Sequence, residues 1–193
     1  MRIESLEQND ADLVEAAQHG RLDSFGALYQ RYHNPIVALA YAQLGDKHAA
    51  EDAAQEVFAV ACRDLGSLRD RDKFGAWLGG ICRNVCRQML RVKTRTAPLP
   101  CSPAAPGWEA DTAQEGGPEQ QEKWDAVRRA VWQLPTEERE LIVMRYFNGF
   151  SQARISQVLD LTPAAVNGRL TRAKRKIAEL LERSGFGSDS WDA

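Results

Sequence analysis

The chain has 193 residues and carries 25 lysines and arginines against 27 aspartates and glutamates, a formal net charge of −2. This length allows one domain or two small ones, and the balanced charge argues against indiscriminate binding to nucleic acid, so contacts with DNA have to come from local basic patches. No apolar run is long enough to span a bilayer and the acidic N-terminus has no signal-peptide core, which predicts a cytoplasmic protein without membrane insertion.

Four helices and no strand are predicted in the first half of the chain. Apolar residues recur there at helical spacing in four segments, which capping and helix-breaking residues separate. The expected helices cover about residues 10–19, 22–44, 47–64 and 72–92. Gly45 is expected to end the second helix, because glycine readily adopts the left-handed conformation that closes many helices.

A change of composition marks a domain boundary after these four helices. Residues 94–118 hold five of the eight prolines together with three glycines, and this composition disfavours a helix. We therefore expect a first domain at residues 1–96, a flexible linker at residues 97–118 and a second domain at residues 119–183. Residues 184–193 are rich in Gly, Ser and Asp and are expected to form a disordered tail.

The second domain is expected to contain four helices, at about residues 119–133, 136–147, 151–159 and 163–183. The last two have the pattern of a helix-turn-helix. Ser151 and Thr162 stand at N-cap positions, and Pro163 follows where a missing N–H costs nothing. Asp160 stands in the turn, where glycine is usual, and tolerates the left-handed conformation better than most residues. The chain is thus predicted to be all-α, with a winged-helix-like four-helix domain at its C-terminal end.

The last helix has the composition of a DNA reader. Val166, Leu170, Ala173 and Ile177 form its buried stripe, and residues 161–176 hold five basic side chains and no acidic one. Polar residues early in the helix and cations late in it suit a major-groove reader, whose first turns face base edges while its cations face phosphates. The alternative is an ordinary helical hairpin with a solvated basic face.

The first domain is expected to have one basic and one acidic surface. Residues 69–95 hold eight basic side chains against two acidic ones. Arg83, Arg87 and Arg91 align at i, i+4 and i+8, where they repel one another unless an anion is present. The third helix instead has an acidic and amide-bearing strip, and the short polar loop at residues 66–73 could wrap an unstacked base. One basic and one acidic surface indicate two macromolecular partners of opposite charge. The alternative interpretation of the basic residues is a solvated face without a partner.

The four cysteines match none of the usual zinc spacings; they are Cys62, Cys82, Cys86 and Cys101. Cys82 and Cys86 lie one helical turn apart, but no histidine is near them in sequence. We interpret the cysteines as small core residues in a reducing compartment, with a shared metal as the alternative, and expect no metal and no cofactor. The chain also lacks a nucleophile motif and a glycine-rich phosphate loop, which argues against an enzyme with a small-molecule substrate.

Several segments in a fixed order resemble the extracytoplasmic-function sigma factors, which are small two-domain bacterial proteins. The resemblance covers about residues 10–183. In the first domain it rests on residues 51–58 (EDAAQEVF), residues 74–78 (FGAWL) and residues 81–84 (ICRN). In the second it rests on Leu134-Pro135, residues 139–147 (RELIVMRYF) and residues 166–174 (VNGRLTRAK).

The resemblance implies that the chain directs promoter-specific transcription initiation and melts the minus-ten element. The implied partners are core RNA polymerase, through its largest and second-largest subunits, promoter DNA and an anti-sigma factor, and the linker would lie near the RNA exit path. The implied polymerase-docking residues are Asp52, Gln55 and Glu56. The implied minus-ten contacts are Leu68, Arg69, Arg71, Lys73, Arg83, Asn84, Arg87 and Arg91. The implied minus-thirty-five contacts are Thr162, Ala164, Asn167, Gly168, Arg169, Thr171, Arg172, Lys174 and Lys176.

Some positions depart from the family pattern. Asn167 and Gly168 stand where members often carry a basic residue and a serine, and Gly79 and Gly80 stand where larger residues are common. Asparagine pairs bidentately with adenine whereas arginine favours guanine, so the promoter sequence does not follow from the resemblance. The alternative function is a stand-alone helix-turn-helix regulator that uses only residues 119–183, but such a protein needs neither the acidic strip nor the linker.

Overall fold

The computed structural model describes residues 9–96 and 118–186, and every regular element within these two ranges is helical. The first range contains α1 (Asp10–Gln18), α2 (Leu22–Leu44), α3 (Lys47–Asp64) and α4 (Phe74–Thr96), with the 3-10 turns η2 (Leu65–Ser67) and η3 (Arg71–Lys73) between α3 and α4. The second contains α5 (Pro118–Gln133), α6 (Thr136–Ile142), the π-helical segment η5 (Val143–Phe147), α7 (Gln152–Leu159) and α8 (Pro163–Arg183). The all-α fold expected from the sequence is confirmed.

Side-chain caps fix where four of these helices begin. The side chains of Asn9, Asp46, Ser151 and Thr162 accept hydrogen bonds of 2.8 to 3.2 Å from the backbone N–H three residues further on. Each cap satisfies a donor that the helix itself leaves unpaired and contributes about 1 kcal/mol. Gly45 ends α2 with a φ of 72°, in the left-handed conformation that the sequence predicts.

α2 is the central helix of the first domain, and α1, α3 and α4 all pack against it. Tyr32 of α2 and Phe74 of α4 are fully buried and meet edge to face, with their ring centroids 5.2 Å apart. The Tyr32 hydroxyl donates a hydrogen bond to the carboxylate of Asp10, which also pairs with Arg31. Burial raises the pKa of Tyr32, and the hydrogen bond to Asp10 adds to that effect, so the hydroxyl remains a donor.

α8 organises the second domain, in which α5, α6 and α7 pack against it. The buried residues of α8 are Val166, Leu170, Ala173, Ile177 and Leu181, which continue the predicted stripe by one residue. The segment predicted as one helix over residues 136–147 winds as an α-helix only to Ile142 and then as η5. Among the described residues this domain has four α-helices and no strand, so it has no wing.

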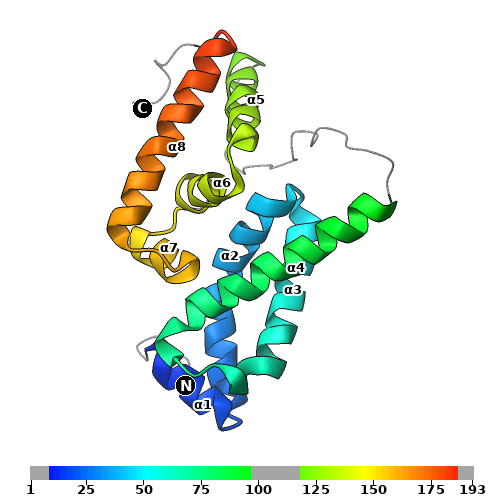
Figure 1. Ribbon diagram of the computed structural model, residues 1–193, viewed down its shortest axis with the longest axis vertical. Coiled ribbons are helices and arrows are strands. Elements are labelled where there is room, and N and C mark those ends of the chain that lie inside the picture. The colour runs from blue at the N-terminus through cyan, green and yellow to red at the C-terminus, as the bar shows by residue number, and fades with distance from the viewer. Residues whose placement is uncertain (1–8, 97–117, 187–193) are drawn as a thin grey trace.

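The two helical domains pack against each other, which the sequence did not predict. In Figure 1 the α5–α8 domain lies above the α1–α4 domain, with α7 next to α4 and α6 next to α2. Tyr41 of α2 meets Trp132 of α5 edge to face at 5.8 Å between ring centroids. The Arg139 guanidinium lies 4.5 Å from the centroid of the Trp132 ring, and its Nε donates a 2.6 Å hydrogen bond to the carbonyl of Ala42. Burial raises the pKa of Tyr41 to about 12.

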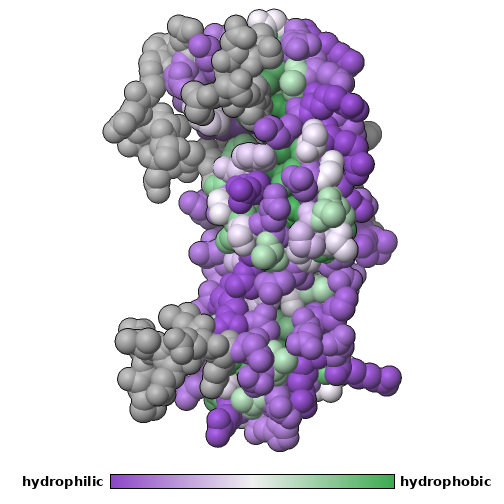
Figure 2. Space-filling view, turned by 90° about the vertical axis from the view of Figure 1, so that its left-hand side faces the viewer, coloured by the Kyte–Doolittle hydropathy of each residue, from purple (hydrophilic) through white to green (hydrophobic). Residues whose placement is uncertain are grey.

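Polar residues cover most of the face seen in Figure 2, and the apolar areas between them are small. None of the helices described here is long and apolar enough to cross a membrane.

The predicted linker lies outside the described residues except for Pro118, which begins α5. The tail was predicted to begin at Ser184, but the chain is still packed at Phe186. The N–H of Phe186 donates to the carbonyl of Leu181 at 3.0 Å, and its side chain packs against the core. Residues 187–193 lie outside the described residues.

Candidate nucleic-acid and partner interfaces

The acidic strip of α3 is an exposed surface. Asp52, Gln55 and Glu56 are all exposed, while Ala53 and Val57 on the opposite side of the helix are buried. Because residues three and four apart share one face of a helix, the three side chains form a single patch. The structure therefore brings together the residues that the resemblance implies for polymerase docking.

The loop at residues 66–73 is fastened to α1. The side-chain amide of Gln18 donates to the carbonyls of Leu65 and Leu68 at 3.0 and 2.9 Å, and its oxygen accepts from Arg71 Nε at 3.0 Å. Arg71 also pairs with Glu15 at 2.9 Å. The Leu68 side chain is only 8% exposed. Leu68 and Arg71 therefore face the protein here, and a contact with DNA by either would require the loop to move.

The basic face of α4 is exposed in one part and in contact with the second domain in another. Asn84, Arg87 and Arg91 are exposed, as is Arg69 in the loop before the helix. Lys73 pairs with Asp160 of the helix-turn-helix turn at 2.9 Å. Arg83 is half-buried, because its guanidinium reaches across to the second domain. The expected row of three arginines is present, but its first member already has an acidic partner.

Glu140 of α6 is that partner, and it lies at the centre of the contact between the domains. It is the one buried charged residue in the described ranges, with 3% exposure. Arg83 Nη2 donates to Glu140 Oε2 at 3.0 Å, and Gln43 Nε2 donates to Oε1 at 3.2 Å. Burial alone lowers the pKa of Arg83, but the hydrogen bond and charge of Glu140 reverse this and leave the pKa raised. A buried carboxylate requires such partners, since an unpaired one is costly.

The helix-turn-helix has the local geometry that its sequence predicts. Asp160 adopts the left-handed conformation, with φ 54° and ψ 49°, and joins α7 to α8. Several residues of α8 and its cap are exposed on the surface, as expected of a DNA reader, and these are Thr162, Ala164, Asn167, Gly168, Thr171, Arg172 and Lys174. The Thr171 hydroxyl donates back to the carbonyl of Asn167 at 3.1 Å.

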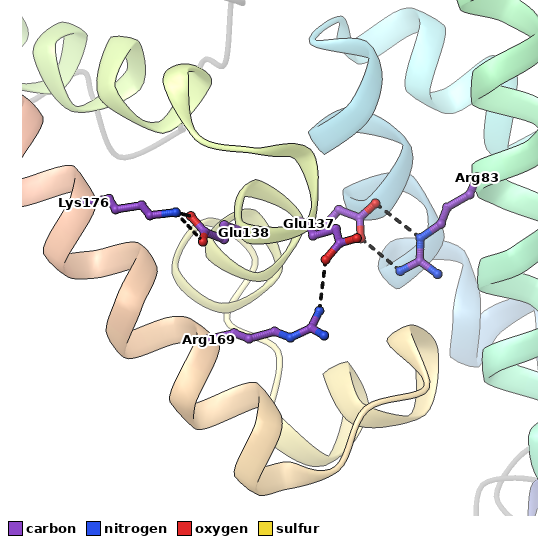
Figure 3. A network of polar contacts seen from close by, with 6 residues as sticks. Arg83, Glu137, Glu138, Arg169 and Lys176 are labelled. Atoms are coloured by element: carbon purple, nitrogen blue, oxygen red, sulfur yellow. Dashed lines mark hydrogen bonds and ion pairs between the residues drawn. The ribbon is translucent and has the colours of Figure 1, made fainter.

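Two cations of α8 are paired within their own domain. Arg169 pairs with Glu137 at 3.3 Å, and Lys176 Nζ lies 2.6 and 2.9 Å from the two carboxylate oxygens of Glu138, as Figure 3 shows. Both glutamates stand in the first turn of α6. These two pairs link α6 to α8, so both cations help to position α8 within its domain. Lys174 instead lies 5.8 Å from the centroid of the Tyr146 ring.

Comparison of the sequence with known proteins identifies the family to which the two helical domains belong. Residues 28–96 match the family described as Sigma-70 region 2, and residues 124–177 match Sigma-70, region 4. The ECF RNA polymerase sigma factor SigM of Mycobacterium tuberculosis is 31% identical over 175 residues, which cover 91% of this chain and 86% of SigM. BldN of Streptomyces coelicolor, also an ECF RNA polymerase sigma factor, is 30% identical over 88% of this chain and 65% of its own length. The chain belongs to the extracytoplasmic-function sigma factors.

A solved structure supports the same fold. CnrH, in its complex with the cytosolic domain of CnrY, matches 90% of this chain and 97% of its own, with 26% identity and a TM-score of 0.58. A sigma factor binds core RNA polymerase and promoter DNA and directs transcription initiation, and it is not an enzyme. The sigma factor described here accordingly uses its surfaces for binding alone.

Residues that the sequence did not single out support both domains of the sigma factor. Arg139 and Glu140 lie in the segment 139–147 that carries the resemblance, yet their roles in the domain contact were not predicted. The available signal was the charged pair Arg139 and Glu140, which stands directly before the apolar run Leu141 to Met144. Two neighbouring charged residues do not by themselves predict burial, because burial of a charge requires a partner. The partners here, Arg83 and the carbonyl of Ala42, belong to the first domain.

The cysteines of the sigma factor have different environments. Cys82 and Cys86 are buried on α4, as expected of core residues, whereas Cys62 is exposed and Cys101 lies outside the described residues. A hydrogen bond between the two buried thiols raises the pKa of Cys82, and burial acts in the same direction. Cys82 Sγ also lies 3.8 Å from the carbonyl of Ile36, so it packs α4 against α2.

Proposed function

We propose that this sigma factor divides its work among three surfaces. The acidic strip of α3 docks on a basic surface of core RNA polymerase, the loop 66–73 with the basic face of α4 holds the melted minus-ten strand, and the first turns of α8 read the minus-thirty-five element. The observation that carries the proposal is the separation of charge. The exposed strip on α3 is acidic, whereas α4 and residues 163–176 of α8 carry exposed cations and no acidic residue. A protein that binds only DNA has no use for the acidic strip.

Run-off transcription tests this proposal against the stand-alone regulator. Core enzyme with the full chain should start transcription at selected members of a randomised promoter library, and the chain without core enzyme should protect no DNA at physiological salt. A stand-alone regulator would give the opposite pattern, with sequence-specific binding in the absence of polymerase and no transcripts that depend on the chain.

We expect the exposed arginines of α4 to contact phosphates without reading sequence. Arg87→Gln with Arg91→Gln should reduce the slope of log K against log salt for a single-stranded minus-ten oligonucleotide by about 1.4, because each lost contact releases about 0.7 fewer counterions. Filter binding between 50 and 300 mM salt measures this slope. The matched control is Arg21→Gln with Lys47→Gln, which removes the same charge from exposed positions at the starts of α2 and α3. Equal slopes for both double variants would contradict a phosphate contact by α4.

We further propose that an anti-sigma factor holds this protein in the cytoplasm, where core polymerase is found. CnrH is known in complex with the cytosolic domain of CnrY, and a related sigma factor in complex with the anti-sigma factor NepR. The expected partner competes with core polymerase or with promoter DNA. Affinity capture with the tagged chain, with and without added core enzyme, should recover such a protein only when the core enzyme is absent.

A further inference from the structure

A cleft of about 400 Å³ opens between the two domains, and arginines from both of them line it. Arg83 and Arg87 come from α4, and Arg169 comes from α8. Figure 3 shows Arg83 and Arg169 extending towards α6 from opposite sides. Small-molecule sites have volumes of about 300–1,000 Å³, so the cleft is large enough for a ligand of its own.

The lining of the cleft is mostly polar. Of the described residues that line it, only Leu159 and Leu161 are apolar, and none is aromatic. Nucleobases and other flat apolar groups bind by stacking on aromatic side chains or by burial against apolar walls, and this cleft has little surface of either kind. Its chemistry therefore favours a small ligand that is polar and charged throughout.

The charges of the lining favour an anion. Three arginines face two glutamates, Glu137 and Glu140, which leaves a surplus of one positive charge. Glu140 is 3% exposed and remains paired with Arg83 at 3.0 Å. The side chain of Glu137 is 80% exposed, and it pairs with Arg169 at 3.3 Å. Because an exposed pair of this kind contributes little to stability, a more strongly charged anion can displace Glu137 from Arg169.

Arg87 and Thr136 supply the other donors that such an anion needs. Arg87 is exposed and has no acidic partner among the residues that the structure describes. The Thr136 hydroxyl accepts a hydrogen bond from Arg139 Nη2 at 3.3 Å, which leaves its own hydrogen free to be donated into the cleft. Guanidinium groups match the geometry of phosphate with two parallel hydrogen bonds, so phosphate is the anion that these side chains suit best.

We propose that this cleft binds a linear inorganic oligophosphate, of which pyrophosphate is the smallest, through Arg87, Arg169 and the hydroxyl of Thr136. Arg83 stays paired with Glu140 and adds its charge to the cleft. Two linked phosphate groups suit the site better than one, because the two binding arginines stand on helices of different domains. A site for a small anion goes beyond the function proposed above, which assigns these arginines to DNA alone.

Titration calorimetry of the full chain with inorganic pyrophosphate, in buffer without divalent cations, tests the site. Wild type should bind one equivalent. Arg87→Gln with Arg169→Gln should weaken binding about tenfold or more, because two charge-assisted contacts are lost. The matched control is Arg91→Gln with Arg172→Gln, which removes the same charge from exposed positions of the same helices outside the cleft. No binding by wild type, or equal weakening in both double variants, would overturn the proposal.

A variant that tightens binding guards against effects of misfolding. Glu137→Gln removes the carboxylate that competes for Arg169, so it should bind pyrophosphate about fivefold more tightly than wild type. Glu138→Gln removes the same charge one residue further along α6, outside the lining of the cleft, and should match wild type. Equal tightening in both variants would show that pyrophosphate responds only to the overall charge, against the proposed displacement.

Competition with DNA links the cleft to transcription, and this step rests on the function proposed above. Pyrophosphate should weaken binding of a single-stranded minus-ten oligonucleotide more than sodium chloride of the same ionic strength, because Arg87 is proposed to contact that strand. The extra weakening should be lost in Arg87→Gln with Arg169→Gln. Calorimetric binding without competition would refute the DNA contact of Arg87 and leave the cleft in place, whereas absence of calorimetric binding refutes the cleft whatever the DNA does.

Discussion

Reversing the charge of Asp52 and Glu56 on α3 should strongly weaken holoenzyme formation. The double variant Asp52→Lys with Glu56→Lys replaces two attractive contacts with two repulsive ones on a surface that is expected to meet a basic partner. At about 1.4 kcal/mol for each position, binding to core polymerase should weaken about 100-fold or more. Competition against a labelled wild-type chain for core enzyme measures the loss, and run-off transcription should fall in parallel.

The fold should survive this change. Both side chains are exposed and make no contact on which the core depends. The control is Glu179→Lys with Glu182→Lys near the end of α8, which makes the same change of net charge at two exposed positions on another helix. Equal affinities of the two double variants for core enzyme would show that the acidic strip is only a solvated face.

Asn167→Arg should change which promoters this sigma factor uses. Asn167 is exposed in the second turn of α8, on the part of the helix that a helix-turn-helix presents to base edges. An asparagine–adenine pair discriminates by about 1–3 kcal/mol, and arginine favours guanine. The preferred base at one upstream position should therefore shift from adenine to guanine, with a change in relative use of about 5-fold to 150-fold.

Selection from a promoter library randomised over the upstream element measures this shift. Arg172→Gln is the comparison, because Arg172 is exposed one turn further along α8 and is expected to contact phosphate. It should weaken all promoters about equally and leave the selected sequence unchanged. The same selected sequence for wild type and Asn167→Arg would show that Asn167 does not read a base.

Lys176 is a poorer reporter of phosphate contact than its position in the sequence indicates. Its side chain is held by both carboxylate oxygens of Glu138, so its removal would also loosen α6 from α8. A uniform loss of promoter binding by a Lys176 variant would therefore mix a lost charge with a displaced helix. Arg172 and Lys174 have no such acidic partner among the described contacts and separate the two effects more cleanly.

The local features of this protein were determined by the sequence alone. Helices begin at Ser151 and Thr162 because a side-chain oxygen there meets a backbone donor three residues away, and Asp160 turns the chain because it tolerates a positive φ. The acidic strip of α3 and the buried stripe of α8 follow from a period of 3.6 residues. Each of these features depends on residues within one or two helical turns of each other, so the order of residue types along the chain is enough to predict it.

Only the tertiary structure decided which charged residues form ion pairs with one another. Arg83 and Glu140 are 57 positions apart, Lys176 and Glu138 are 38 apart, and Arg169 and Glu137 are 32 apart. Periodicity places each side chain on a face of its helix but does not say which other face it meets. Leu68 was expected in an open loop, but its side chain is buried, and its carbonyl accepts a hydrogen bond from Gln18, 50 residues earlier. The close packing of α7 on α4 at Gly79, where an added Cβ would lie 2.3 Å from the carbonyl oxygen of Val158, was likewise decided by the tertiary structure. The sequence shows the glycine but not which helix packs against it.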